Sequence, residues 1–437
     1  MPIVTLPDRL RRPSQNRQAS TTPVPPPGRT RRPRLYVIDG LRLIAALSVV
    51  LFHWTGVDRH PEVWGTTPRH LMPTLHRFGA YGWMGVQLFF LISGFVICMS
   101  CWGKTPRQYF VSRVVRLYPA YWVGILLTAL VVNFAPTVRP DRKPLSISEI
   151  LTNFTMLERP LGVTEADGVY WTLWIELRFY LLFAVVAVLG LTYRRVLAFC
   201  GIWMILAVIT PSTGSKLMDV LFMPQDAPYF IAGVAMYLVY RFGVSPLLIG
   251  VVGFSWLIAQ NRLHVTVGAY EYEVGHPLSW PVMAVISAAA FLVMLGVALG
   301  WFGWVRWSWL AVAGAMTYPV YLLHQEIGWA LIRYGRDLHV RPAPLLAACL
   351  AVVLTLAWCV HRLAERPLSA ALQRLFDGRG PVLPAGDPPV LARAAAGPGH
   401  LPLPAQTPAG RPMAALAGDR SGARRCGAPG GRPALPV

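Results

Sequence analysis

Ionisable side chains inside long apolar stretches are the residues of this sequence best placed to do chemistry. Three apolar stretches hold such side chains in pairs: Arg42 with His53, Glu176 with Arg178, and His324 with Glu326. Each group costs about 2.5 to 3.5 kcal/mol at the middle of a membrane, so its presence predicts a functional site. A structural alternative is that these groups pair with one another and hold the helices together.

Arg42 and His53 are expected to form one polar stripe. They are 11 residues apart, which on an α-helix places them within about 20° of the same face and about 16 Å apart along the axis. Asp39 stands three residues before Arg42, so it is expected to cap the helix start or to pair with Arg42. Histidine can accept a proton near neutral pH, whereas arginine stays charged and can bind or orient an anion.

The other two pairs are each separated by two residues. Glu176 and Arg178 must therefore point to roughly opposite faces of their helix, and each needs a partner elsewhere. Glu176 shares its face with Thr172 and Tyr180, a polar line suited to a cavity. Pro319 stands one turn before His324, so this helix is expected to bend and to border the cavity.

Composition indicates what kind of protein carries these groups. Of 437 residues, 54% are hydrophobic and 14% charged, against roughly 25% charged in an average soluble domain, which excludes an ordinary soluble globule. The net charge of +20 would normally suggest a nucleic-acid partner. The segments 1–34 and 364–437 carry +12 of it, so we predict no nucleic-acid partner and expect contact with a lipid bilayer instead.

The apolar stretches predict an all-α, polytopic membrane helix bundle. Ten of them approach or reach the length of about 20 residues that a spanning helix needs. They are 35–54, 78–103, 117–138, 170–191, 196–215, 227–240, 242–261, 278–305, 307–332 and 342–360. We therefore predict about ten transmembrane helices.

Loop charges predict the orientation and the domain limits. Arginines before the first stretch place both termini in the cytoplasm, and the loop holding Arg333, Arg336 and Arg341 is the one exception to the pattern. We predict a basic, Pro-rich, disordered tail at 1–34, a membrane domain at 35–367 and a mostly disordered cytoplasmic tail at 368–437. No cleavable signal peptide is expected at the start. Cys98 and Cys101 form a lone C-x-x-C, for which we predict no metal.

Five motifs and a closing E-R-P, in order along 36–367, make the sequence resemble the acyltransferase-3 family of integral membrane O-acyltransferases. The first is D-G-L-R at 39–42 followed by F-H at 52–53, and the second is GVQLFFLISGF at 85–95. Next come RVVRLYP at 113–119 and WTLWIELRFY at 171–180. The last are YPVYLLH at 318–324 and ERP at 365–367. Gln87 departs from the family, in which many members carry an acidic residue there.

The resemblance implies transfer of an acyl group, usually acetyl, from cytoplasmic acyl-CoA to a hydroxyl of a glycan or glycosylated small molecule. It implies the stand-alone form in a bacterial cytoplasmic membrane, with acyl-CoA as donor substrate and no bound cofactor. The CoA phosphates need cations at the inner face, and Arg113 and Arg116 supply two guanidiniums one helical turn apart. Plain positive-inside charge is the alternative explanation for that pair.

These considerations give a set of expected site residues. We expect His53 to act as general base on the acceptor hydroxyl, with Glu176 fixing its tautomer or stabilising the imidazolium; an acyl-histidine intermediate is the alternative. Arg42 is the third expected catalytic residue, able to bind an anion or to orient a group. The donor is expected to contact Arg113, Arg116 and Tyr118. The remaining cavity residues are expected to be Asp39, Ser93, Tyr180, Arg178 and His324.

Two other interpretations are open. Buried Arg, Glu and His also mark the pathways of transporters and flippases, although no internal repeat is visible. His53 also begins an H-x-x-x-x-D that ends at Asp58, a pattern used by glycerolipid acyltransferases of a different fold. We expect that match to be chance.

Overall fold

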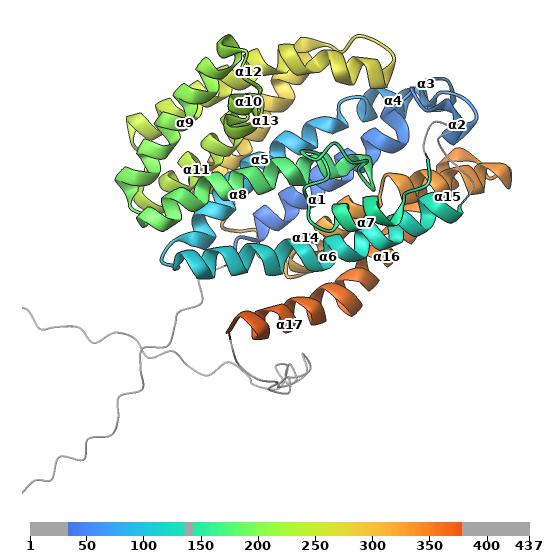
Figure 1. Cartoon of the computed structure of the whole chain (residues 1–437). Helices are drawn as coiled ribbons and strands as arrows, with labels where there is room; N and C mark the ends of the chain where they lie inside the picture. Colours follow the sequence, from blue (N-terminus) through green and yellow to red (C-terminus); the bar gives the residue numbers. More distant parts are fainter. Residues whose placement is uncertain (1–33, 136–142, 378–437) are drawn as a thin grey trace, which may run out of the picture. The chain divides into compact units, whose positions relative to one another are not determined.

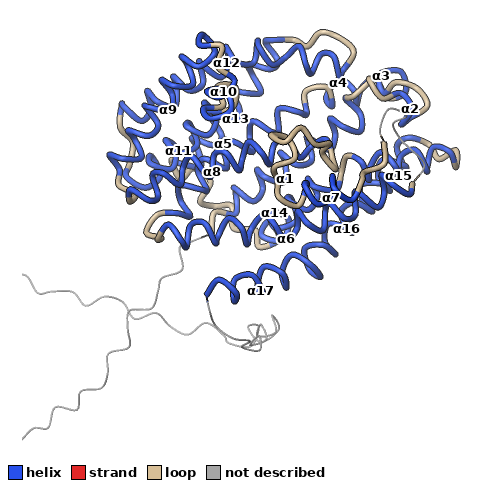
Figure 2. The backbone as a smooth tube through the Cα atoms, viewed as in Figure 1, coloured by secondary structure: helices blue, strands red, loops and turns tan. Residues whose placement is uncertain are grey.

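The structure is a computed structural model that describes residues 34–135 and 143–377. The predicted all-α class is confirmed, because the described residues contain helices and no strand, as Figure 2 shows. The tail at 1–34, except for Arg34, and residues 378–437 of the other predicted tail lie outside the described residues. A helix from Arg366 to Asp377 crosses the predicted domain limit at 367, so the first residues of the predicted tail are helical.

Each predicted apolar stretch overlaps one of the longer helices. They are α1 (Tyr36–Leu51), α5 (Gly85–Cys101), α6 (Pro106–Phe134), α8 (Trp171–Leu189), α9 (Tyr193–Thr213), α11 (Ala227–Phe242), α12 (Pro246–Val274), α13 (Trp280–Ala298), α14 (Trp309–Leu323) and α16 (Pro342–Cys359). Eight helical segments among the described residues are long and apolar enough to cross a membrane. Because α11 and α14 are shorter, with 16 and 15 residues, the count of ten stays a prediction.

Shorter helices connect the long ones. They are α2 (Pro61–Trp64), α3 (Pro68–Leu71), α4 (Pro73–Gly79), α7 (Ile147–Asn153), α10 (Lys216–Phe222), α15 (Glu326–Asp337) and α17 (Arg366–Asp377). Two single turns of 3₁₀ helix are Gly82–Met84 and Gly168–Tyr170. Two segments of π-helix, Phe52–Gly56 and Val360–Glu365, extend α1 and α16.

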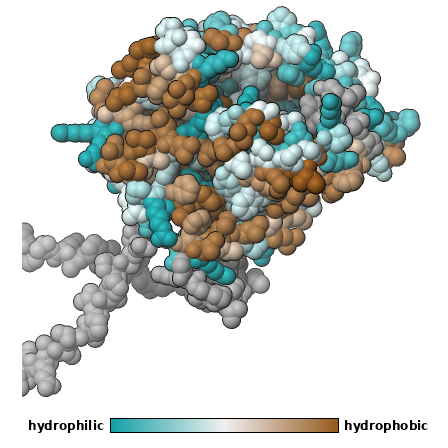
Figure 3. All heavy atoms as spheres, in the orientation of Figure 1, coloured by the Kyte–Doolittle hydropathy of each residue, from teal (hydrophilic) through white to brown (hydrophobic). Residues whose placement is uncertain are grey.

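The helices form two groups around α1, α5 and α8. Figure 1 shows α9 to α13 gathered on one side and α6 with α14, α16 and α17 on the other. Helix α11 is the centre of the first group, and all its residues from Ala227 to Val239 are buried. Large apolar side chains on the outer helices, such as Leu130, Val188 and Leu292, are more than half exposed. Figure 3 shows such hydrophobic side chains over much of one face, as expected where helices meet lipid.

Small residues bring α5 and α11 unusually close. A Cβ atom built on Gly94 would lie 2.2 Å from the Phe230 carbonyl oxygen, and one built on Gly233 would lie 2.1 Å from that of Leu91. Real side chains cannot approach so closely, so both positions require glycine. Such close approach is how helices gain contact in membranes, where burial of apolar surface drives little association.

The predicted single helix at 307–332 is wrong, because the chain breaks there into α14 and α15. Helix α14 runs through Pro319 and ends at Leu323, and α15 begins at Glu326, so His324 and Gln325 stand between the two helices. The groups freed by the break have partners. The Trp54 indole donates to the His324 carbonyl at 2.8 Å, and the Glu326 backbone N–H donates to Asp167 at 3.3 Å.

Candidate active site

A cavity of about 280 Å³ opens between α1, α5, α6, α8 and α14. Most of its wall is apolar, which suits a small-molecule site with a few polar groups. Six of the predicted site residues line it, namely Arg42, Ser93, Arg113, Arg116, Glu176 and Tyr180. The sequence therefore identified the polar part of this cavity from four different helices. We call it the inner cavity.

Glu176 is held by two hydroxyl groups. Ser93 of α5 donates to its carboxylate at 2.5 Å, and Tyr180, one turn along α8, donates to the same oxygen. Thr172 lines the cavity from the preceding turn, so the predicted polar line on α8 is confirmed. Because a charged acceptor makes stronger hydrogen bonds than a neutral one, these contacts fix the carboxylate in place.

Two of the cavity's arginines retain donor capacity. Arg42 has neither a hydrogen bond nor an ion pair among the described residues, although it lines the cavity. Within residues 34–135 and 143–377, Arg113 donates only to the hydroxyls of Ser100 and Ser112, and its guanidinium lies 5.7 Å from the Tyr180 ring centroid. Neither guanidinium is neutralised by a carboxylate contact, so both can bind an anion.

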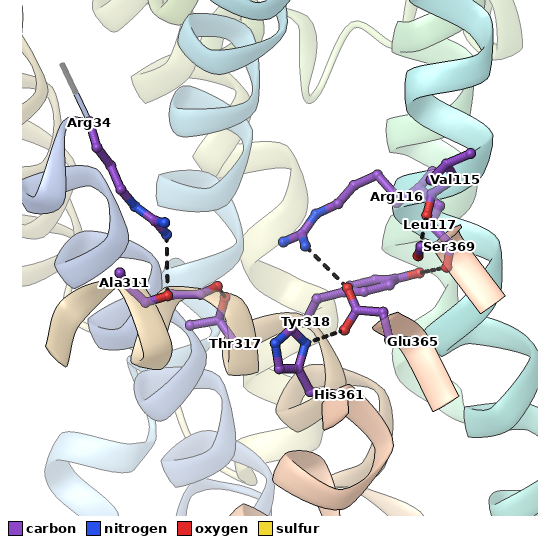
Figure 4. A network of polar contacts seen from close by, with 11 residues as sticks. Arg34, Val115, Arg116, Leu117, Ala311, Thr317, Tyr318, His361, Glu365 and Ser369 are labelled. Atoms are coloured by element: carbon purple, nitrogen blue, oxygen red, sulfur yellow. Dashed lines mark hydrogen bonds and ion pairs between the residues drawn. The ribbon is translucent and has the colours of Figure 1, made fainter. Parts of the chain in front are cut away.

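Arg116 is instead part of an ion-pair network, shown in Figure 4. Its Nη1 lies 3.2 Å from Oε1 of Glu365, whose other oxygen is 2.8 Å from Nδ1 of His361. Glu365 is buried and belongs to the π-helical segment after α16. Glu365 begins the E-R-P motif, from which no role for its side chain could be predicted. Arg116 thus joins α6 to the end of α16 and has less capacity for a ligand than Arg113.

His53 pairs with His324. Nε2 of His324 lies 3.1 Å from Nδ1 of His53, and the same Nδ1 is 2.9 Å from the Val49 carbonyl oxygen. Nδ1 of His324 lies 2.8 Å from the Tyr321 carbonyl oxygen. The pair is one side chain away from the inner cavity, because the Tyr321 ring lines that cavity and lies 5.6 Å from the His324 ring.

These contacts assign the tautomers of both rings. A carbonyl oxygen only accepts, so Nδ1 of each histidine must carry a proton. His324 Nε2 is then an acceptor for the His53 Nδ1–H, which it shares with the Val49 carbonyl. Nε2 of His53 is left without a proton, which is the state that a general base requires.

Glu176 is not the partner of His53, which corrects the predicted contact. Its carboxylate is held by Ser93 and Tyr180, and the position beside Nδ1 of His53 is taken by His324. The prediction treated α1 as a regular α-helix. The chain around His53 is π-helical instead, and such a wider turn changes the direction of its side chains.

Three other predicted residues lie away from the inner cavity. Tyr118 donates to the Thr155 carbonyl at 3.2 Å, because it follows Arg113 by five residues and so points to a different face of α6. Asp39 pairs with Arg34 at 2.8 Å rather than with Arg42, and no side chain caps the start of α1. Arg178 lines a second cavity on the opposite face of α8, as its spacing from Glu176 predicted.

Asp58 does not contact His53 either. Its carboxylate accepts from the Arg69 backbone N–H at 3.0 Å and lies 3.6 Å from Nδ1 of His76. The H-x-x-x-x-D pattern therefore has no counterpart in the geometry, as expected.

Sequence reasoning missed three residues of α14 that complete the inner cavity. They are Thr317, Tyr318 and Tyr321, all in or beside the YPVYLLH motif. The Tyr318 hydroxyl donates to the Leu117 carbonyl at 3.2 Å, and that of Tyr321 lies 2.7 Å from the Thr172 hydroxyl. Polar residues at every third or fourth position of the motif were the signal that could have identified them.

Comparison with known proteins agrees with this site. Residues 35–362 match a family model described as an acyltransferase domain, acyltransferase-3. The chain is 26% identical over 398 residues to Acyltransferase MdmB of Streptomyces mycarofaciens, covering 81% of this chain and 96% of that protein. It is 25% identical over 311 residues to the Exopolysaccharide production protein ExoZ of Rhizobium meliloti, covering 68% and 92% respectively.

A peptidoglycan O-acetyltransferase, OatA of Listeria monocytogenes, is 26% identical over 171 residues, covering 35% of this chain and 24% of that protein. No solved structure matches the chain. The family model covers three quarters of the sequence and includes every residue of the inner cavity. This multi-pass membrane protein therefore belongs to the acyltransferase-3 family of membrane O-acyltransferases.

Proposed function

We propose that this acyltransferase moves an acyl group, acetyl in the simplest case, from cytoplasmic acyl-CoA to a hydroxyl of a glycan or glycosylated small molecule. We place it in the cytoplasmic membrane of a bacterium, and the use of 37 arginines against three lysines fits a GC-rich genome. The observation that carries the proposal is the inner cavity, with two uncompensated arginines at its wall and a paired histidine behind Tyr321.

The donor end of the reaction is assigned to the arginine side of the cavity. CoA carries phosphates, and guanidinium groups bind phosphate through paired N–H donors. Arg113 and Arg42 have such donors free of carboxylate partners. Arg116 contributes by holding α6 against Glu365, which fixes the position of Arg113 one turn away.

The chemical step is assigned to His53. Its unprotonated Nε2 takes the proton of the acceptor hydroxyl while the hydroxyl oxygen attacks the thioester carbonyl carbon. The carbon–sulfur bond then breaks, and the proton on Nε2 passes to the CoA sulfur, which leaves as the thiol. The hydroxyl proton ends on the CoA sulfur and the acyl group on the hydroxyl oxygen, so no other reactant is needed. His53 returns to its starting state.

The test is acetyl transfer with purified full-length protein and radiolabelled acetyl-CoA. Slow release of CoA without an acceptor is expected from the wild type, and His53→Ala should lower turnover by about 10² to 10⁴. Exposed His339 provides the matched control, since His339→Ala should leave turnover unchanged. Near wild-type turnover in His53→Ala would refute the assignment of the base.

The same assay separates this proposal from a transporter. A transporter or flippase without acyl chemistry would release no CoA from acetyl-CoA in any variant. Family membership favours the acyltransferase.

A further inference from the structure

A second, larger cavity lies on the other face of α8. Its volume is about 750 Å³, which is within the range of about 300 to 1,000 Å³ typical of ligand sites. Helix α8 separates it from the inner cavity: Glu176 and Tyr180 face one cavity, and Trp174 and Arg178 face the other. Arg159 and Glu165 also line it. They lie between the third and fourth predicted spans, which a cytoplasmic N-terminus places on the outer side of the membrane. We call it the outer cavity.

The outer cavity is lined by equal numbers of positive and negative side chains, and only some of them pair with each other. Arg159 and Glu165 pair with each other at 3.3 Å. Arg178 and Arg262 each donate to one backbone carbonyl, and each keeps a buried Nε–H that has no acceptor. The carboxylates of Asp226 and Glu273 also line the cavity. Two arginines and two carboxylates around one cavity suit a neutral ligand with many hydroxyl groups rather than an anion.

Burial within the cavity raises the pKa of Asp226 to about 7, although Arg178 and Arg159 oppose the shift. A carboxyl group with this pKa can donate or accept a hydrogen bond near neutral pH. Hydroxyl groups, which also do both, are its natural partners.

Four aromatic rings complete the wall: Trp171, Trp174, Tyr229 and Tyr270. The Arg178 guanidinium lies over the Trp174 ring, 5.4 Å from its centroid, so a flat ring and a charged donor are in contact. An aromatic face packs against apolar C–H groups and an adjacent donor binds the hydroxyls at their edge. Sugar rings present this combination, with an apolar face and a polar rim.

The outer cavity is linked to the histidine pair by a chain of aromatic contacts. The Tyr270 ring lies 6.1 Å from the Phe52 ring, and the Phe52 ring lies 5.0 Å from that of His53. A ligand against Tyr270 is therefore two side chains from His53. The histidine pair thus stands between the inner cavity and the outer cavity.

We propose that the outer cavity binds the glycosyl part of the acceptor, with Trp174 as the stacking platform and Arg178, Arg262 and Asp226 as hydroxyl ligands. This inference rests on the proposed function only in that it identifies the bound sugar as the acyl acceptor. Binding of a sugar ring depends on the cavity alone.

The experiment measures sugar binding without acyl chemistry. Full-length protein in lipid nanodiscs is mixed with the methyl pyranosides of glucose, galactose, mannose and N-acetylglucosamine, and saturation-transfer NMR reports binding. Sorbitol, with hydroxyls but no ring, and inorganic phosphate are the comparison probes. We expect at least one pyranoside to bind more strongly than both.

Variants locate the site. Trp174→Ala and Arg178→Gln should each weaken pyranoside binding about fivefold or more, as expected for a lost hydrogen bond or stacking contact. Trp304→Ala and Arg306→Gln remove the same side-chain types from an exposed loop and should leave it unchanged. No pyranoside binding above sorbitol, preferred binding of phosphate, or unchanged binding in both cavity variants would each overturn the proposal.

CoA release from acetyl-CoA, measured on the same samples, separates the two proposals and confirms that the variants are folded. If CoA is released but pyranoside binding ignores Trp174 and Arg178, the cavity assignment fails and the acyltransferase proposal stands. If no CoA is released but binding depends on these residues, the acyl-CoA proposal fails and the sugar site stands.

Discussion

His53 owes its tautomer to one group of its own helix and to one that the sequence does not place beside it. The Val49 carbonyl one turn earlier and His324, 271 positions later in the chain, both lie at Nδ1. Together they hold the proton on Nδ1 and leave Nε2 free. A buried histidine with only one of these contacts could also adopt the other tautomer, so the second contact serves to keep a single reactive form.

Replacing His324 should slow the chemical step without weakening donor binding. His324→Leu removes one of the two acceptors at Nδ1 of His53, and we expect kcat to fall roughly fivefold, the equivalent of ~1 kcal/mol for one hydrogen bond. His324→Gln keeps a side-chain acceptor and should recover most of the loss. The measurement is kcat and KM for acetyl-CoA. A rise in KM at constant kcat, or equal loss in both variants, would assign His324 to binding or to folding instead.

At the scale of elements, α8 was predictable and α1 was not. Spacing alone gives Glu176 and Arg178 opposite faces, and the structure puts a cavity on each. Helix α1 changes to π-helix at Phe52, and the chain breaks after α14 at Gln325. Both irregular segments depend on contacts between distant residues, such as Trp329 donating to the His53 carbonyl at 2.8 Å. Contacts between residues so far apart in the chain cannot be predicted from the local sequence.

The contact of α5 with α11 predicts the cost of added volume. In Gly233→Ala the new methyl group would meet the Leu91 carbonyl oxygen at 2.1 Å, so we expect the free energy of unfolding to fall by about 1 to 3 kcal/mol. Gly253 in α12 is exposed and has no atom within 4 Å of an added Cβ. Gly253→Ala should therefore be neutral or stabilising by up to ~1 kcal/mol. Thermal unfolding of the purified variants measures both, and equal melting temperatures would contradict the close packing.

At the scale of the whole molecule, the orientation is a prediction from loop charges, and the structure shows partners for one arginine of the loop that opposed it. Arg336 donates to the Glu62 carbonyl and pairs with Asp337 at 2.6 Å. The Arg336 guanidinium is therefore held by neighbouring residues, and the loop remains the one exception to the positive-inside pattern. The remaining loops agree with cytoplasmic termini.

Labelling of single cysteines tests that orientation. In a variant whose Cys359 and Cys426 are serine, Leu338→Cys should react with a membrane-impermeant maleimide in intact cells. Ser308→Cys should react only after lysis, because the loop before α14 is predicted to face the cytoplasm. Both positions are exposed, so access depends on the side of the membrane. The reverse pattern would invert the predicted topology and place the arginines of the inner cavity outside.

The sequence by itself determined the helical class, the membrane setting, the family and most of the polar residues of the inner cavity. It could do so because apolar length, charge bias and helical spacing are local properties of the chain. The tertiary structure alone decided which charges remain free. Arg116 is neutralised by Glu365 and Asp39 by Arg34, whereas Arg42 and Arg113 stay open. It also decided that His324, not Glu176, sits beside His53, because a hydrogen-bond partner is fixed by distance in space and helix packing sets that distance.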